Sequence, residues 1–314
     1  MQKSEYPSAL IITLVVVFGI LSVSTSSIFI RSAQADSVNS MVIASARLLV
    51  ASLILAPLAL TRYRQELSKV SKKDLALGAF SGFFLALHFM SWITSLEFTT
   101  IISSVVLVTT TPLWVAILAP FLLNEKVSPG LVFGMALALV GGLLIALSDS
   151  CTWTGGFTCA PFSEILNGNS FIGNLLATLG AWMAAGYILI GRQLRSKLSL
   201  IPYIFIVYGF AAIFSMAFVI GMGYQITGFA PKTYLWLALL GLVPQLFGHS
   251  SFNWALKYLN ATMVSVLLFG EPIGSTILGI IVYKEIPPLL SILGGVLILI
   301  GIFITTTSSG KKKS

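Results

Sequence analysis

The sequence predicts an all-α multi-pass membrane protein with ten transmembrane helices, arranged as two inverted five-helix repeats. The first observation is composition: 57% of the 314 residues are hydrophobic and 9% are charged, whereas a soluble domain carries about 25% charged residues. The second is a succession of apolar runs, each close to the roughly 20 residues that cross a membrane. The third is an internal repeat that relates the two halves of the chain.

The apolar runs are bounded by charged residues or turn signals and fill almost the whole chain, so no separate soluble domain has room to fold. The first run is too long for the apolar core of a signal peptide and lacks a convincing cleavage site, so we expect it to be retained as a helix. The expected spans are residues 9–30, 38–60, 75–95, 101–123, 129–148, 170–191, 202–223, 233–254, 261–283 and 289–307.

The internal repeat becomes visible when the chain is shifted by 160 positions. Because five helices per half is an odd number, the second half must enter the membrane from the opposite side. Inverted repeats of this kind are typical of secondary transporters, whose sites lie between the halves near the membrane midplane. Arg31 also aligns with Arg192, and a two-residue gap aligns Trp92 with Trp254. The shift pairs Pro112 with Pro272, Glu125 with Glu285, Gly134 with Gly294, and Gly141 with Gly301.

The repeats define the expected domain organisation. Residues 1–148 form the first five-helix repeat, 149–169 an outer connecting loop, 170–307 the second repeat, and 308–314 a short cytosolic tail. The loop holds both cysteines, Cys151 and Cys159. They form either a disulfide, if the loop lies outside the cell, or two free thiols. A metal site there would lack companion His or Cys ligands, and we expect neither a metal nor a cofactor.

Basic residues set the expected orientation. With the N-terminus inside, fourteen of the eighteen Lys and Arg residues fall in inside segments, whereas only Arg31, Lys232 and Lys284 fall outside. Cytoplasmic loops retain Lys and Arg during insertion, so we expect a cell-membrane protein with both termini in the cytoplasm. The net charge of +8 is then explained by topology and contact with anionic lipid, and does not indicate nucleic-acid binding.

Two stretches, TTTPLWVAILAPFLLNEKVSPG and LLFGEPIGSTILGIIVYKEIPP, together with the ten inverted spans, resemble the drug/metabolite transporter superfamily, specifically its EamA-type members. The resemblance covers residues from about 9 to 307. In that family each repeat has a Pro-containing fourth helix, a Glu at its end and a Gly-rich fifth helix. The resemblance implies a carrier for small metabolites, often an exporter of amino acids or related compounds.

Two ionised residues, Arg47 and Glu271, fall within the predicted hydrocarbon zone. A charge there costs roughly 2.5–3.5 kcal/mol on insertion scales, so it must face a wet cavity or a partner. Arg47 is either a structural clamp or a ligand for a substrate carboxylate. Glu271 is either a cap at the helix break beside Pro272 or a proton carrier, because apolar surroundings favour the neutral form of a carboxyl group. Its counterpart in the first repeat is Thr111.

Polar side chains mark the third span of each half. Gln245, His249 and Asn253 recur at every fourth position and should lie along one helical face, as should His88 and Trp92. Such faces either form hydrogen bonds between helices or line a cavity that binds a polar substrate. Two histidines alone do not predict a metal site. The aromatic residues that could supply walls for a cavity, or pack against lipid, are Trp92, Trp114, Tyr187, Tyr208 and Phe269.

We therefore expect a secondary transporter that moves an unphosphorylated small metabolite by alternating access, with protons as a candidate coupling ion. Pro112 and Pro272 remove helical hydrogen bonds, which suits gating or a static bend. Exchange of nucleotide sugars, phosphate esters or drugs is the alternative within the fold, and a membrane-embedded enzyme is the alternative from another class. The expected substrate site is Arg47, His88, Trp92, Tyr208, Gln245, His249, Asn253 and Glu271.

Overall fold

The computed structural model describes residues 6–148, 151–153, 157–159, 168–284 and 287–310. Lys3, Glu285, Lys311–Lys313 and most of the loop between the repeats lie outside these described residues. Within them, eight helices are long and apolar enough to cross a membrane, and two of the predicted spans contain shorter apolar stretches, Pro129–Leu144 and Leu289–Gly301. The predicted all-α multi-pass fold is confirmed.

Each half contains helices that are interrupted along their length. In the first half the elements are α1 (Ala9–Ser24), α2 (Ser26–Ala35), α3 (Ser40–Arg62), α4 (Arg64–Leu67), α5 (Lys72–Phe98), α6 (Ile101–Val108), α7 (Thr111–Leu123) and α8 (Pro129–Leu147). In the second half they are α10 (Asn169–Arg195), α11 (Leu200–Gly221), α12 (Pro231–Leu240), the π-helical η1 (Gly241–His249), α13 (Ser250–Ala255), α14 (Ala261–Leu267), α15 (Gly270–Tyr283) and α16 (Leu289–Gly310).

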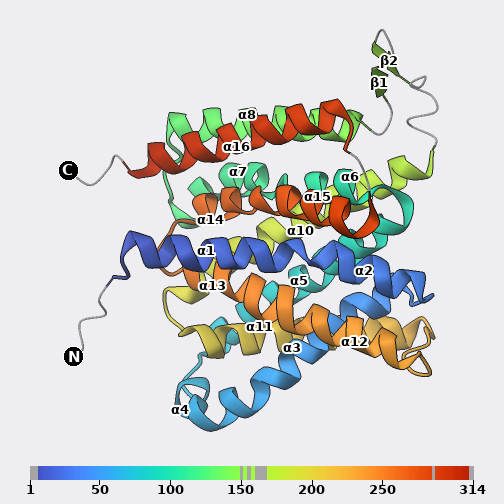
Figure 1. The fold of residues 1–314 in the computed structure, drawn as a ribbon. Coiled ribbons are helices and arrows are strands. Elements are labelled where there is room, and N and C mark those ends of the chain that lie inside the picture. Colours follow the sequence, from blue (N-terminus) through green and yellow to red (C-terminus); the bar gives the residue numbers. More distant parts are fainter. Residues whose placement is uncertain (1–5, 149–150, 154–156, 160–167, 285–286, 311–314) are drawn as a thin grey trace.

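A two-stranded antiparallel hairpin lies between the halves, in the segment predicted as a loop. Strand β1 (Cys151–Trp153) pairs with β2 (Phe157–Cys159), and Cys151 lies opposite Cys159. The two cysteines are joined by a disulfide. The hairpin projects from the end of the molecule opposite to the start of α1 and the end of α16 (Figure 1).

The fourth helix of each half breaks at the same place in the repeat. In the first half α6 ends at Val108 and α7 begins at Thr111, and in the second half α14 ends at Leu267 and α15 begins at Gly270. Proline follows each break, because a residue without an N–H is tolerated in the first turn of a helix. The prolines predicted to interrupt these spans, Pro112 and Pro272, lie in the first turns of α7 and α15.

The inverted arrangement is visible where the last helices of the two halves, α8 and α16, lie side by side (Figure 1). A Cβ atom added to Gly141 would overlap the carbonyl oxygen of Gly294, and one added to Gly301 would overlap that of Gly134. Residue numbers therefore rise along α8 in the direction in which they fall along α16, so the two helices are antiparallel. The four glycines are those that the repeat matches, but each one contacts a member of the other matched pair.

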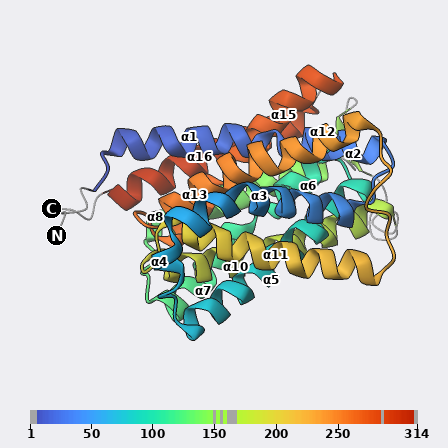
Figure 2. The ribbon, with the colours of Figure 1, turned by 90° about the horizontal axis from the view of Figure 1, so that it is seen from below.

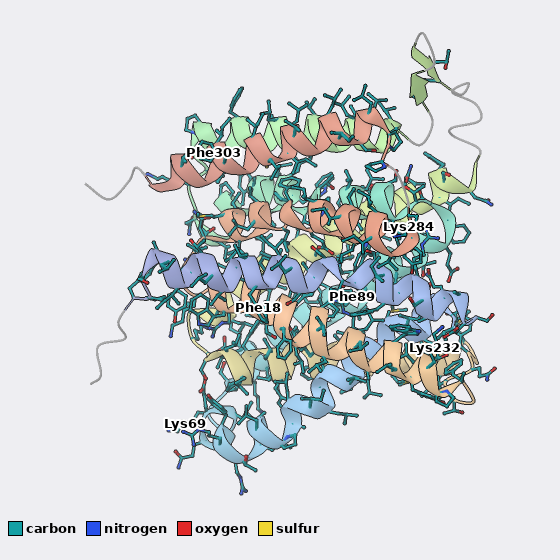
Figure 3. The ribbon with its side chains drawn as sticks, viewed as in Figure 1. Phe18, Lys69, Phe89, Lys232, Lys284 and Phe303 are labelled. Carbon is teal, nitrogen blue, oxygen red and sulfur yellow. A yellow bond between two sulfur atoms is a disulfide. The ribbon has the colours of Figure 1, made fainter. Side chains whose placement is uncertain are left out.

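The outer surface is apolar, as a lipid environment requires. Phe18 and Phe303 are among the large hydrophobic side chains that are more than half exposed. Figure 3 places Lys69 at one end of the helix bundle and Lys232 and Lys284 at the other, with Phe89 between them. Seen from below, the start of α1 and the end of α16 again lie at one end (Figure 2), so the chain enters and leaves the bundle on the same side.

Candidate functional site

A cavity with a volume of about 40 Å³ lies between the two halves. One ordered water needs roughly 10–15 Å³ of such space, so the cavity has room for only a few waters and this conformation is nearly closed around the site. The third membrane span of each half contributes to its walls: α5 in the first half, and η1 with α13 in the second. The broken fourth spans also contribute, namely α6 with α7 and α14 with α15. The lining residues are His88, Trp92, Val108, Thr109, Thr111, Ala184, Tyr187, Ile188, His249, Phe252, Asn253, Leu256, Val264, Leu268 and Glu271.

Histidines from both halves meet at this cavity. The Nδ1 atom of His88 lies 2.9 Å from the carbonyl oxygen of Gly180. A carbonyl can only accept, so Nδ1 carries the hydrogen, and in the neutral ring Nε2 is left as an acceptor. The ring centroids of His88 and His249 lie 6.4 Å apart, and Trp92 stacks on His88 at 6.0 Å. The site thus offers imidazole nitrogens beside an aromatic surface.

An amide and two phenols form a second polar group at the cavity. Tyr187 on α10 donates to the Oδ1 atom of Asn253 over 2.7 Å, and the Nδ2 atom of Asn253 donates to the hydroxyl oxygen of Tyr208 on α11 over 3.0 Å. The Tyr208 hydroxyl also lies 3.3 Å from the hydroxyl of Ser250. These bonds fix the Asn253 side chain, because its oxygen and nitrogen each have a defined partner.

Glu271 and Thr111 occupy equivalent positions in the two halves, and both line the cavity. Glu271 lies in the first turn of α15, where the helix dipole favours a negative charge. Thr111 directs its hydroxyl hydrogen toward backbone carbonyls, with Val108 at 2.8 Å and Ala181 at 3.3 Å. In the described part of the chain the Glu271 carboxyl group has no hydrogen-bonding partner, and it is the sole acidic group lining the cavity.

Arg47 lies behind the cavity, fully buried. Its Nε atom donates to Oε1 of Gln245 over 2.7 Å and its Nη1 atom donates to the hydroxyl of Ser26 over 3.1 Å. The guanidinium carbon lies 4.0 Å from the ring centroid of Phe89, and that ring lies 5.2 Å from the ring of His249. Phe89 therefore separates Arg47 from the cavity. Within the described chain, Nη2 of Arg47 and Nε2 of Gln245 have no hydrogen-bonding partner.

The structure brings five of the eight predicted site residues to the cavity: His88, Trp92, His249, Asn253 and Glu271. Arg47, Gln245 and Tyr208 instead lie in the layer directly behind it. The predicted single stripe of Gln245, His249 and Asn253 assumed an α-helix, but residues 241–249 form the π-helix η1. A π-helix has more residues per turn, so side chains four apart no longer superimpose, and Gln245 contacts α3 instead.

Three further polar residues at the cavity, Thr109, Thr111 and Tyr187, are not part of the predicted site. The alignment of the two repeats points to Thr111, because it matches this position to that of Glu271. Tyr187 is among the aromatic residues that the sequence offers as cavity walls. The apolar lining residues carry no comparable signal, since their types are common in packed membrane helices. No group of three His, Cys, Asp or Glu side chains suited to a metal occurs among the residues that the structure describes.

Comparison with known proteins gives related sequences over most of the chain. The EamA-like transporter family matches residues 10–147 and 171–307. A Bacillus subtilis protein named "Uncharacterized transporter YdfC" is 27% identical over 200 residues, which cover 63% of this chain and 60% of that protein. An Archaeoglobus fulgidus protein named "Uncharacterized transporter" is 23% identical over 264 residues, covering 83% and 85% of the two chains.

A protein of known crystal structure has the same fold. Its superposition on this chain has a TM-score of 0.73 at 20% sequence identity, and it covers 98% of this chain and 100% of the other. At that identity the similarity concerns the fold alone. The two matched segments of the sequence correspond to the two halves that pack around the cavity.

Proposed function

Because the chain belongs to the EamA-like transporter family, we propose that it is a secondary transporter that exports an amino acid or a related unphosphorylated metabolite by alternating access. The membership concerns a family of transporters, not enzymes. The choice of substrate class rests on the chemistry of the cavity, and the direction of transport rests on the resemblance to EamA-type transporters, which are often exporters.

The observation that carries this proposal is the combination of one carboxyl group with neutral hydrogen-bonding groups and aromatic rings around a single cavity. Glu271 is suited to an ammonium group, since opposite charges attract strongly where water is excluded. His88 and His249 offer ring nitrogens for the other polar atoms of the substrate. Trp92 and Phe252 provide apolar surface for a side chain.

The substrate carboxylate would bind on the Arg47 side of the cavity. Arg47 has an Nη2 group without a partner among the described residues, and a guanidinium favours a carboxylate. The Phe89 ring must move aside for the two to meet. The cavity must also widen, because a space of about 40 Å³ has room for only a few waters at roughly 10–15 Å³ each. Both changes fit a binding event that is coupled to a conformational change.

Phosphorylated substrates fit less well. Phosphate groups are bound by clusters of Arg and Lys, and the lining of this cavity includes neither residue type. Exchange of nucleotide sugars or phosphate esters is therefore disfavoured. Uncharged drugs remain the second candidate, because aromatic and aliphatic side chains dominate the walls.

A thermal-shift screen of the purified protein tests the proposal, since a ligand raises the unfolding temperature according to its concentration relative to Kd. We expect amino acids to stabilise the protein and phosphate esters to leave it unchanged. His249→Ala and Trp92→Ala should each weaken binding of the best amino acid by about 1–3 kcal/mol. Phe247→Ala is the matched control, because Phe247 is on the same helix as His249 and is 45% exposed. Stabilisation by phosphate esters alone would contradict the proposal.

A further inference from the structure

An ion pair between the two halves lies next to one end of the cavity. Nε of Arg192, on α10, lies 2.9 Å from Oε1 of Glu125, which follows α7. The other carboxylate oxygen of Glu125 accepts the backbone N–H of Ala261, at the start of α14, over 2.9 Å. Arg192 also donates through Nη1 to the carbonyl oxygen of Leu256 over 2.6 Å. Leu256 itself lines the cavity.

These bonds tie the first half to two helices of the second half. Glu125 belongs to the first repeat, whereas Arg192, Leu256 and Ala261 belong to the second. The side chains of Arg192 and Glu125 are 28% and 15% exposed, so the pair is partly shielded from water, and charge-assisted hydrogen bonds of this kind are stronger than neutral ones. The end of α7 cannot move away from α10 and α14 unless both oxygens of Glu125 lose their partners.

The equivalent arginine, Arg31, lies at the opposite end of the molecule, where the counterpart of Glu125, Glu285, is outside the described residues. Arg31, which the repeat pairs with Arg192, donates through Nη2 to the carbonyl oxygen of Thr99 over 2.8 Å. Thr99 directly follows the last residue of α5, as Leu256 directly follows that of α13, so the arginine-to-carbonyl contact is of the same kind at both ends. Among the described residues, however, Nε of Arg31 has no partner, whereas Nε of Arg192 is bound to an acid.

The Arg31 end also contains a larger space, which we call the vestibule. Its volume is about 580 Å³, and Arg31, Asp36, Leu96, Glu97 and Lys232 are among its lining residues. Leu96 is four residues after Trp92, which lines the central cavity, and four residues make about one turn of α-helix. The vestibule and the cavity are thus neighbours along α5.

We infer that the Glu125–Arg192 pair is the closed gate of the central cavity, and that in this conformation a substrate approaches from the vestibule at the Arg31 end. This inference rests on the proposed transport function and names the contacts that must break for the cavity to open at its other end. Glu125 and Arg192 control whether the cavity can be reached from this end, and they do not bind the substrate themselves.

Labelling of a cavity cysteine tests the gate without any substrate. In a background with Cys151→Ser and Cys159→Ser, Ala184→Cys places a thiol in the cavity, and the protein is reconstituted in vesicles of defined orientation. Lys126→Cys and Lys232→Cys, both exposed, report separately which face a membrane-impermeant maleimide reaches. We expect the cavity thiol to react from the Lys232 face and to be protected from the Lys126 face.

Glu125→Gln and Arg192→Gln should each speed labelling from the Lys126 face by about tenfold, because loss of a charge-assisted hydrogen bond changes an equilibrium by that order. Asp74→Asn is the control: it breaks the Asp74–Lys197 pair, which is 2.6 Å long and also joins α5 to the segment after α10, but neither residue is hydrogen-bonded to one that lines the cavity. The unfolding temperature of each variant reports whether it is folded.

Unchanged labelling from the Lys126 face in both folded gate variants would overturn the inference, as would an equal increase in Asp74→Asn. Protection of the cavity thiol from the Lys232 face would also overturn it. Failure of the proposed substrate class is a separate outcome, because the thermal-shift screen would then show no amino-acid binding while the labelling pattern still held.

Discussion

The Nε atom of Arg47 donates a hydrogen bond to Oε1 of Gln245 over 2.7 Å, and this bond joins α3 of the first half to η1 of the second. Both side chains are fully buried. Because neither group can exchange its partner for water, the bond is part of what holds the halves in register behind the cavity. Arg47 thus has a structural task in addition to the role that we propose for it in binding.

Arg47→Lys tests the structural task. Lysine lacks the planar fork of arginine, so it cannot donate to Gln245 and Ser26 and also stack on Phe89. We expect the variant to lose about 1–3 kcal/mol of stability, the range for a lost bond to a charged group, measured by thermal unfolding in detergent. Arg62→Lys at the exposed end of the same helix should change stability by less than about 0.5 kcal/mol. Equal effects of the two substitutions would show that the buried bonds contribute little.

The antiparallel contact of α8 and α16 gives a second prediction. A methyl group at Gly301 would overlap the carbonyl oxygen of Gly134 and approach the backbone nitrogen of Ala138 to 3.0 Å. Gly301→Ala should therefore destabilise the protein by about 1–3 kcal/mol, the usual effect of overpacking. Gly295→Ala on the same helix meets nothing within 4 Å and should be neutral or stabilising, by up to about 1 kcal/mol of helix propensity. Thermal unfolding of the two variants compares them, and a stable Gly301→Ala would contradict the close packing.

Sequence reasoning predicted the fold well because membrane helices leave strong signals. Length, apolarity and the paired prolines and glycines are each imposed by the bilayer or by close contact of helices. The contact of Gly141 with Gly294 joins members of two different repeat pairs, because the repeat matches Gly141 to Gly301 and Gly294 to Gly134. The β1–β2 hairpin had no such signal, because a short polar segment between spans carries neither apolar runs nor a repeat.

The site was predicted less completely, and the reason lies in local geometry. Residue type identified Glu271, His88 and His249, since polar groups at membrane depth require a partner or a cavity. Whether such a group lines the cavity or lies one layer behind depends on helix rotation, and the π-helix η1 changed that rotation for Gln245. The position of Phe89 in front of Arg47 follows from packing between halves, which no spacing along one helix can give.

The orientation of the protein in the membrane is predicted from the basic residues. A cysteine introduced at Gly168, in the absence of Cys151 and Cys159, should react with an impermeant reagent applied outside cells, whereas one at Ser68 should not. Labelling of intact cells, with permeabilised cells as the control for reactivity, measures this. The reverse pattern would contradict cytoplasmic termini. In a eukaryotic host the sequon at Asn260 should also stay unglycosylated, because it lies on the inner side in this orientation.

Glu271 provides the test of proton coupling. Its carboxyl group lines the cavity without a hydrogen-bonding partner in the described chain, so a proton and a substrate ammonium would compete for it. Substrate affinity should fall as the pH falls, because protonation removes the charge that binds the ammonium, with a limit of about tenfold per pH unit for one proton.

Glutamine has the shape of a protonated glutamate and cannot ionise. Glu271→Gln should therefore bind substrate more weakly at high pH and show no dependence on pH, with a folded yield like that of the wild type. Glu97→Gln, which changes an exposed acid in the vestibule, should retain the dependence. Binding and liposome flux measured over a range of pH values distinguish these cases. The same pH dependence in the wild type and in Glu271→Gln would leave Glu271 with a structural role, and proton coupling would then have to use another group.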